Sequence, residues 1–190
     1  MGLVPFLKNK AIDPSMIIVD SKSGVTGAGR GAVLESLFSE VNDSVHAYKV
    51  GKHRHMPEIE QALSIAAGQK VVINFTPHLV PMDRGILSTI YAKASKKMDT
   101  KETLKILADA YKGEPFVRVL PEGTLPKTKH VRGTNVCELG AMHDPRTDRV
   151  ILIAAIDNLM KGAASQAVQN MNLVCGFPET AGLDLLPLVP

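Results

Sequence analysis

The triplet His53-Arg54-His55 carries the side chains best suited to proton transfer and anion binding in this sequence. Histidine has an unperturbed pKa of about 6.5, so it can give or take a proton near neutral pH. A proline and a glutamate follow, and apolar side chains then recur at helical spacing, which predicts a helix over residues 57–67. The N-terminal end of a helix favours an anion. The triplet therefore predicts an acid–base or anion site, and a solvated basic turn is the alternative.

Residues 21–31 form a second segment that could hold an anion. They contain four glycines and three hydroxyl side chains and follow a β-branched run at residues 16–20. Glycines let backbone N–H groups approach an oxyanion closely. The segment lacks the closing Gly-Lys-Ser/Thr of a Walker A loop and the Gly-x-Gly-x-x-Gly of a dinucleotide site. An ordinary loop is the alternative interpretation.

The composition is that of an ordinary globular protein. The chain has 190 residues, of which 45% are hydrophobic and 22% charged, with a net charge of +3. This charge is too small to indicate nucleic acid, and the absence of Trp argues against a base-stacking surface. No apolar run approaches the ~20 residues of a membrane span. Cys137 and Cys175 lie in apolar surroundings and are predicted to be buried thiols in a reducing compartment, not metal ligands.

Hydrophobic patterning predicts an α+β fold. Helices are expected over residues 2–10, 57–67, 102–112 (after a cap at Asp99 or Thr100) and 157–174. Strands are expected over residues 16–20, 44–50, 70–76, 86–92, 116–120, 136–142 and 149–156. Turns are expected at Asp13-Pro14 and from Pro77 onward, and residues 32–43 are expected to be a connector. Strands in runs, together with strands alternating with helices, favour a mixed sheet covered by helices on one face.

The last predicted helix begins at Asp157 and Asn158, and small residues make one part of it narrow. Such a helix can approach another backbone closely, although a core helix is the simpler interpretation. The apolar, proline-containing tail at residues 183–190 is expected to dock on the surface.

Four stretches together resemble the N-acetyl-γ-glutamyl-phosphate reductase family, in order and in spacing. They lie at residues 21–30, 53–59, 75–85 and 156–172. The resemblance covers nearly the whole chain. It implies the fold of the C-terminal domain shared by the glyceraldehyde-3-phosphate and aspartate-semialdehyde dehydrogenase group.

The resemblance also implies a reaction. The family reduces N-acetyl-γ-glutamyl phosphate to the semialdehyde with NADPH, in arginine synthesis. A cysteine thiolate attacks the acyl phosphate, phosphate leaves, and hydride transfer to the thioester releases the aldehyde with a histidine as acid/base.

The chain departs from the family pattern in one respect. The dinucleotide-binding domain and the Gly-Cys-Tyr-Pro-Thr motif with the nucleophile are not found in residues 1–190, and neither Cys137 nor Cys175 matches that motif. The resemblance therefore implies that residues 1–190 are a single C-terminal substrate-binding and dimerisation domain. We expect it to be cytoplasmic, inactive alone, and part of a dimer or tetramer that also contains the N-terminal domain.

The resemblance assigns roles to individual residues. His53 is the expected acid/base, with His55 as the alternative or as a phosphate or carboxylate contact. Ser23 and Gly24 are expected to contact phosphate or substrate near the nicotinamide. Four further residues are expected to be substrate-anion or structural partners: Tyr48, Arg54, His78 and Arg84.

The cofactor NADP is expected to be bound mainly by the absent N-terminal domain. Within this chain, Asn158 resembles the asparagine that holds the nicotinamide carboxamide, and Lys161 is either a phosphate contact or a surface lysine.

Two other functions stay open from the sequence. The chain could be a non-catalytic anion-binding or interaction module. It could also belong to a reductase for the aminoadipyl phosphate analogue, because one methylene changes binding by only ~1–3 kcal/mol.

Overall fold

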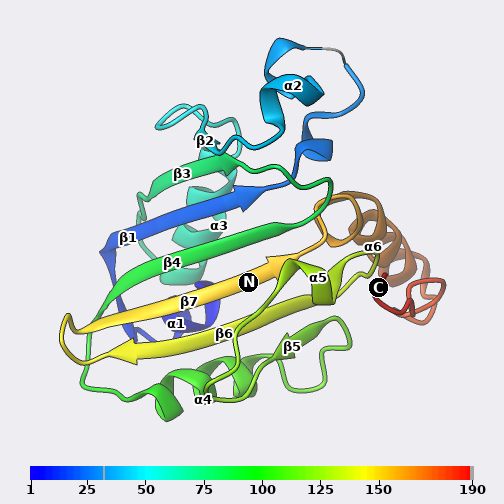
Figure 1. The fold of residues 1–190 in the computed structure, drawn as a ribbon. Coiled ribbons are helices and arrows are strands. Elements are labelled where there is room, and N and C mark those ends of the chain that lie inside the picture. The colour runs from blue at the N-terminus through cyan, green and yellow to red at the C-terminus, as the bar shows by residue number, and fades with distance from the viewer. Residues whose placement is uncertain (32, 189–190) are drawn as a thin grey trace.

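The computed structural model describes residues 1–31 and 33–188. In this part of the chain, one mixed sheet has the strand order β2-β3-β1-β4-β7-β6-β5 (Figure 1). The strands are β1 Ile12–Ser23, β2 His46–Ala47, β3 Asn74–Leu79, β4 Ile86–Ala94, β5 Val117–Val119, β6 Cys137–Asp144 and β7 Arg149–Ile156. The helices are α1 Val4–Lys8, α2 Phe38–Val41, α3 Met56–Ala67, α4 Thr100–Ala110, α5 Thr128–Val131 and α6 Ser165–Cys175.

The core lies between the sheet and helices α1, α3 and α4, which lie behind the sheet in Figure 1. Side chains of successive strands line up in rows across this face, such as Val19, Ile90, Leu152 and Ala141. These residues are buried, as are Phe6, Leu63 and Leu107 on the three helices. The predicted α+β fold, with a mixed sheet covered by helices on one face, is confirmed.

Among the described residues, no helix covers most of the opposite face of the sheet (Figure 1). The row of Ile18, Tyr91, Ile151 and Met142 crosses four neighbouring strands. Ile18 is 38% exposed and Met142 42% exposed. We call the surface around this row the open sheet face. Its apolar character distinguishes it from the polar face expected of a solvated sheet.

The strand expected at residues 70–76 is shifted along the chain. It occupies Asn74–Leu79, and Pro77 lies inside it. Two earlier N–H groups bond to side chains of α3: Val71 N–H donates to Ser64 Oγ at 2.9 Å, and Ile73 N–H to Glu60 Oε1 at 3.2 Å. The proline is tolerated because β2 pairs with β3 over only two residues, so Pro77 has nearly the position of an edge residue.

Other predicted boundaries also moved. Asp13-Pro14 is not a turn but lies within β1, where the pairing with β4 is irregular between Ile12 and Ile17. The strand expected over residues 44–50 is reduced to His46–Ala47. The connector at residues 32–43 contains short helical turns at Leu34–Ser36 and Phe38–Val41, while Ala32 lies outside the described residues.

The sequence signals for the end of α3 and the start of α4 agree with the structure. α3 ends at Gly68, which has a left-handed φ of 66°, and Asp99 and Glu102 form a capping box at the start of α4. The last helix begins with a π-helical turn at Met160–Ala164 before α6. Cys137 is buried as predicted, but the prediction for Cys175 was wrong, because its thiol is exposed at the end of α6.

The C-terminal tail docks in part, as predicted. Leu183 is buried, and the N–H of Leu188 donates to the carbonyl oxygen of Arg132 at 2.9 Å. Residues 189–190 lie outside the described part of the chain.

Candidate active site

The glycine-rich segment after β1 packs against residues 82–85. Gly24 N–H donates to the carbonyl of Gly85 at 2.9 Å, and Val25 N–H to that of Met82 at 3.0 Å. The hydroxyl of Thr26 donates to the carbonyl of Asp83 at 2.6 Å. The N–H groups of residues 24 and 25 are thus engaged within the protein, so the anion cradle expected from them is not formed by these two groups.

At Gly24 the backbone of the glycine-rich segment comes very close to the backbone of residues 82–83. A Cβ atom at this position would lie 2.7 Å from the carbonyl oxygen of Asp83 and 2.8 Å from that of Met82. Both neighbours are backbone atoms, which cannot move aside as a side-chain end can. The glycine is therefore required by the packing of two backbones, whatever further role it has.

Asn158, at the start of the last helix, contacts both of these segments, and we call the place where they meet the junction. Its Oδ1 accepts the N–H of Gly85 at 2.8 Å, and its Nδ2 donates to Thr26 Oγ1 at 2.9 Å. Asn158 is only 6% exposed. Three segments that are distant in sequence thus meet here: residues 23–28, residues 82–85 and residues 157–158. The structure brings Ser23, Gly24 and Asn158 together, as the resemblance led us to expect.

Arg84 lies in this junction, but its guanidinium group bonds to a side chain of the protein, that of Asp157. Its Nη2 and Nε donate to Asp157 Oδ1 at 2.9 and 3.3 Å. Burial alone would raise the pKa of Asp157, but hydrogen bonds from Gly133 N–H, Arg84 and the N–H groups of Met160 and Leu159 outweigh it and lower that pKa. Of the two roles that the resemblance left open for Arg84, the geometry favours the structural one.

His53 lies in a cluster of rings at the β3 edge of the sheet. Its ring centroid is 5.7 Å from that of Tyr48, 5.0 Å from that of His55 and 5.2 Å from that of Phe75. Burial lowers the pKa of His53, and the charges of His55, Lys49 and Arg54 lower it further. Burial raises the pKa of the Tyr48 hydroxyl.

One ring nitrogen of His53 has a partner. The N–H of His55 points to His53 Nδ1 at 3.3 Å. Because Nδ1 is then an acceptor, the neutral ring carries its proton on Nε2. In this tautomer the Nε2–H group can donate a hydrogen bond. His55 itself and Arg54 are exposed beside it.

The His53 cluster and the glycine segment are separated along β3. His53 contacts Phe75, which is four residues before Leu79, and Leu79 is the residue that pairs with Ser23. Four residues of strand span about 13 Å at ~3.3 Å per residue. The structure thus places His53 along the strand from Ser23, and not against it. Ser23 Oγ donates to the carbonyl of Gly24 at 3.1 Å.

Two further expected site residues lie elsewhere. His78 pairs with Lys22 on the open sheet face, where its Nδ1 is 3.2 Å from Asp20 Oδ1. Lys161 is buried, and its Nζ donates to Gln169 Oε1 at 2.6 Å and lies 5.5 Å from the Phe116 ring centroid. Burial lowers the pKa of Lys161. Neither side chain contacts Gly24, Thr26 or Asn158, and their proposed ligand contacts stay predictions. The alternative that Lys161 is a surface lysine was wrong, because the side chain is buried.

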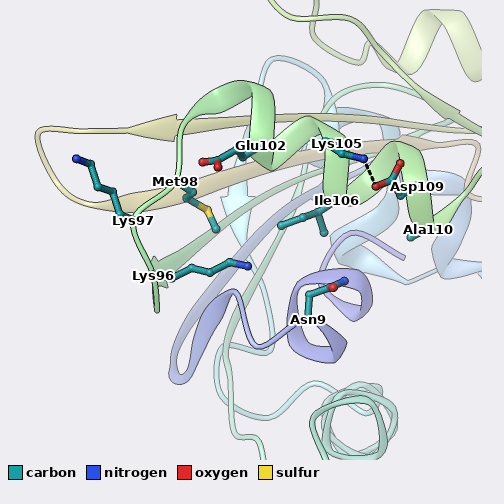
Figure 2. Close-up of a pocket in the computed structure, with 9 residues that line it drawn as sticks. All are labelled: Asn9, Lys96, Lys97, Met98, Glu102, Lys105, Ile106, Asp109 and Ala110. Atoms are coloured by element: carbon teal, nitrogen blue, oxygen red, sulfur yellow. Dashed lines mark hydrogen bonds and ion pairs between the residues drawn. The ribbon is translucent and has the colours of Figure 1, made fainter.

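A surface hollow of about 490 Å³ lies far from this junction, between α4 and the end of α1 (Figure 2). Met98 and Ile106 form its apolar part. Lys96 and Lys97 lie at its border, and Lys105 is already paired with Asp109 at 2.6 Å. Nothing in its lining matches the chemistry of the junction, so we do not assign the site to it.

Two residues of the junction were not predicted from the sequence. Thr26 was counted only as a hydroxyl in a loop, and Asp157 only as the start of a helix. An aspartate directly before a helix is a capping signal, and this could have indicated that Asp157 binds backbone N–H groups. Its contacts to Arg84 and Gly133 had no signal in sequence.

In residues 1–31 and 33–188, no group of three His, Cys, Asp or Glu side chains could hold a metal ion. None of the helices in the described ranges is long and apolar enough to cross a membrane.

The relatives with similar sequences share the same protein name. An N-acetyl-gamma-glutamyl-phosphate reductase from Geobacter metallireducens is 63% identical over 191 residues, covering 100% of this chain and 55% of the relative. One from Pelotomaculum thermopropionicum is 58% identical over 183 residues, covering 96% of this chain and 53% of the relative. The chain thus spans about half the length of the curated relatives it matches, and the resemblance drawn from the motifs is confirmed.

Solved structures show the same fold at low sequence identity. Aspartate semialdehyde dehydrogenase II from Vibrio cholerae has a TM-score of 0.69 and 16% identity, over 92% of this chain and 59% of that one. A probable aspartate-semialdehyde dehydrogenase from Pseudomonas aeruginosa has a TM-score of 0.70 and 18% identity, over 92% and 58%. These structures confirm the expected fold group.

A family model described as "Semialdehyde dehydrogenase, dimerisation domain" matches residues 1–158, which include every strand of the sheet and Asn158. The chain therefore belongs to the semialdehyde dehydrogenase dimerisation-domain family.

Proposed function

We propose that this chain is the substrate-binding and dimerising part of an NADPH-dependent reductase that converts N-acetyl-γ-glutamyl phosphate to the semialdehyde and phosphate. The observation that carries the proposal is the contact of Asn158 with Thr26 and Gly85, which unites the glycine segment with the start of the last helix. The names of the relatives, at up to 63% identity over the whole chain, supply the substrate.

The junction offers a place for the nicotinamide carboxamide. Asn158 Nδ2 uses one hydrogen on Thr26, so its second hydrogen is left to donate. Gly27 lies beside it: a Cβ atom there would be 3.5 Å from Asn158 Nδ2 and 3.7 Å from Ser23 Oγ. The absence of a side chain at Gly27 leaves the Asn158 amide and the Ser23 hydroxyl next to open backbone, and both groups can hydrogen-bond a carboxamide. When bound, NADPH supplies a hydride.

His53 is the proposed proton donor. As the acid/base, the neutral ring would first take the proton of the attacking thiol, and the resulting imidazolium would return it to the oxygen that develops negative charge as the acyl group is reduced. Burial and the neighbouring charges lower the pKa of the imidazolium, so it gives up this proton readily and returns to the neutral form. Because hydride and proton are added to the same carbonyl group, the reacting carbon would have to lie between the nicotinamide at Asn158 and the His53 ring.

Two exposed apolar surfaces support the proposed partners. The open sheet face, with Ile18 and Met142 exposed, supports packing against a second copy of the domain. The last helix and the tail expose Leu173, Val174 and Leu186. This second surface supports docking of a dinucleotide-binding domain, which corresponds to the part of the relatives that this chain does not cover.

A chimera tests the proposed activity. This chain would replace the matched part of the Geobacter metallireducens reductase, and NADPH oxidation would be followed at 340 nm with N-acetyl-γ-glutamyl phosphate. We expect turnover by the chimera and none by the 190-residue chain alone. An inactive but folded and dimeric chimera would contradict the proposal, and so would turnover by the chain alone.

The same assay addresses the choice of substrate. We expect the aminoadipyl phosphate analogue, which is one carbon longer, to react with a kcat/KM roughly 10–200-fold lower, which is the usual effect of one methylene in a pocket. A preference for the longer substrate would assign the chain to the aminoadipyl reaction instead.

A further inference from the structure

Asp157 is the most heavily bonded side chain of the junction. It is 0% exposed. Its Oδ1 accepts from Leu159 N–H at 2.8 Å, Met160 N–H at 2.9 Å and the guanidinium of Arg84, and its Oδ2 accepts from Gly133 N–H at 2.7 Å. A single carboxylate thus collects N–H donors from three separate parts of the chain.

These three parts all border the proposed cofactor site. Arg84 belongs to residues 82–85, whose carbonyls hold the glycine segment. Leu159 and Met160 begin the last helix. Gly133 belongs to the loop between α5 and β6, and α5 also reaches the site, because a Cβ on Gly85 would lie 2.8 Å from Thr128 Cβ. Asp157 therefore links residues 82–85, the loop at Gly133 and the first residues of the last helix, next to Asn158.

We propose that Asp157 and Arg84 form the positioning pair of this reductase: their ion pair, in which the Asp157 carboxylate is fully buried and the Arg84 side chain 23% exposed, fixes the Asn158 amide between Gly85 and Thr26, and Arg84 is not a substrate-anion group. The inference rests on the proposed function for its kinetic consequences, but its geometry is independent of them. Both nitrogens of Arg84 that bond to Asp157 are committed within the protein.

The chemistry requires a carboxylate at position 157. All partners of Asp157 are donors, and a carboxylate is purely an acceptor with about four lone-pair sites. Asparagine has the same shape, but its NH₂ group would face another donor. Asp157→Asn is therefore disruptive although it is nearly isosteric. Arg84→Gln is milder, because Asp157 then keeps its three backbone donors.

Kinetics of the chimera test the role of the pair. For Arg84→Gln we expect at least a tenfold lower kcat and a fivefold or greater rise in the KM for NADPH, while the KM for the acyl phosphate stays within twofold. Arg84→Lys keeps the charge but replaces the two donating nitrogens of the guanidinium with a single ammonium group, so we expect partial rescue. A large rise in the KM for the acyl phosphate alone would instead make Arg84 a substrate contact and overturn the proposal.

The matched control is Arg146→Gln. Arg146 also pairs with an aspartate, Asp144, at 3.0 Å, but its side chain is 85% exposed in the hairpin at the far end of β7. We expect its kinetics to stay within twofold of the unsubstituted chimera. Equal losses in Arg84→Gln and Arg146→Gln would also overturn the proposal.

Hydrogen exchange of the 190-residue chain gives a readout that needs no activity. In Arg84→Gln, peptides covering residues 22–28, 80–86 and 157–163 should exchange at least tenfold faster, with peptides of β6 and β7 unchanged. If the chimera is inactive but this pattern appears, the proposed function fails and the positioning pair stands. If these peptides are unaffected, the pair does not hold the junction and the inference fails, whatever the activity.

Discussion

Asn158 donates a side-chain N–H to the hydroxyl of Thr26 at 2.9 Å, although the two residues are 132 positions apart in the chain. The same side chain accepts the N–H of Gly85. Together these two bonds make the start of the last helix and the glycine segment one structural unit. The arrangement explains how residues from opposite ends of the sequence can serve one site.

Substituting Gly24 should destabilise the fold through this unit. In Gly24→Ala the new Cβ would meet the carbonyl oxygens of Asp83 and Met82 below 3 Å. Overpacking of this kind costs about 1–3 kcal/mol. We expect a loss of that size in the free energy of unfolding, measured by urea denaturation of the 190-residue chain.

Gly31→Ala is the control for that experiment, because a Cβ at position 31 would have no heavy atom of the described residues within 4 Å, its chain neighbours aside. We expect its stability to change by less than ~0.5 kcal/mol. Equal losses in the two variants would show that the close approach at Gly24 is not the cause.

A charge in the centre of the open sheet face should prevent dimer formation. Ile151 lies between Tyr91 and Met142 in the apolar row. In Ile151→Lys, burying an unpaired ammonium against a second copy would be strongly unfavourable. We expect the dimer to dissociate to a monomer in light-scattering measurements at micromolar concentration.

Ile65→Lys serves as its control. Ile65 is equally apolar and 77% exposed, but it lies on α3, away from the open sheet face. A dimer that survives Ile151→Lys, or that is lost in both variants, would exclude the open sheet face as the interface.

The titration of His53 should reflect its surroundings. Burial and neighbouring cations lower its pKa below 6.5, the ordinary value for histidine. The unfolded chain then takes up this proton more readily than the native one. The stability contributed by neutral His53 is therefore complete above pH 6.5 and falls as the pH decreases from 6.5 toward the lowered native value.

NMR titration of the histidine ring resonances measures this shift directly. We expect a midpoint below 6.5 for His53, and we expect His53→Asn to lose less stability between pH 7.5 and 5.5 than the unsubstituted chain. A midpoint at or above 6.5 would contradict the environment described for the ring cluster.

The two cysteines should differ in reactivity. Burial raises the pKa of Cys137 to about 11, with opposing effects from the N-terminal ammonium and Lys161, whereas Cys175 is exposed. Because the thiolate is the reactive form, we expect Ellman's reagent at pH 8 to label Cys175 rapidly in the native chain. Cys137 should react only after unfolding. Rapid labelling of Cys175→Ser would contradict the burial of Cys137.

Much of the fold could be predicted from sequence because its signals are local. The capping box at Asp99 and the glycine after α3 define helix ends within a few residues of chain. The β-branched residues of β4 and the continuous apolar run of β7 indicate strands, because such runs bounded by turns are typical of buried strands. β3 was misplaced because Val71 and Ile73 resemble strand residues, while their N–H groups bond to side chains of α3.

The sequence by itself determined the family, the helix ends and the residues able to do chemistry, because motifs and capping signals depend on neighbours along the chain. Only the tertiary structure decided what those residues contact. It turned Arg84 toward Asp157, placed His78 on the open sheet face and separated His53 from Ser23. The reason is that strand pairing and burial depend on partners tens of residues away, and neither side-chain type nor spacing specifies which face or which partner each residue receives.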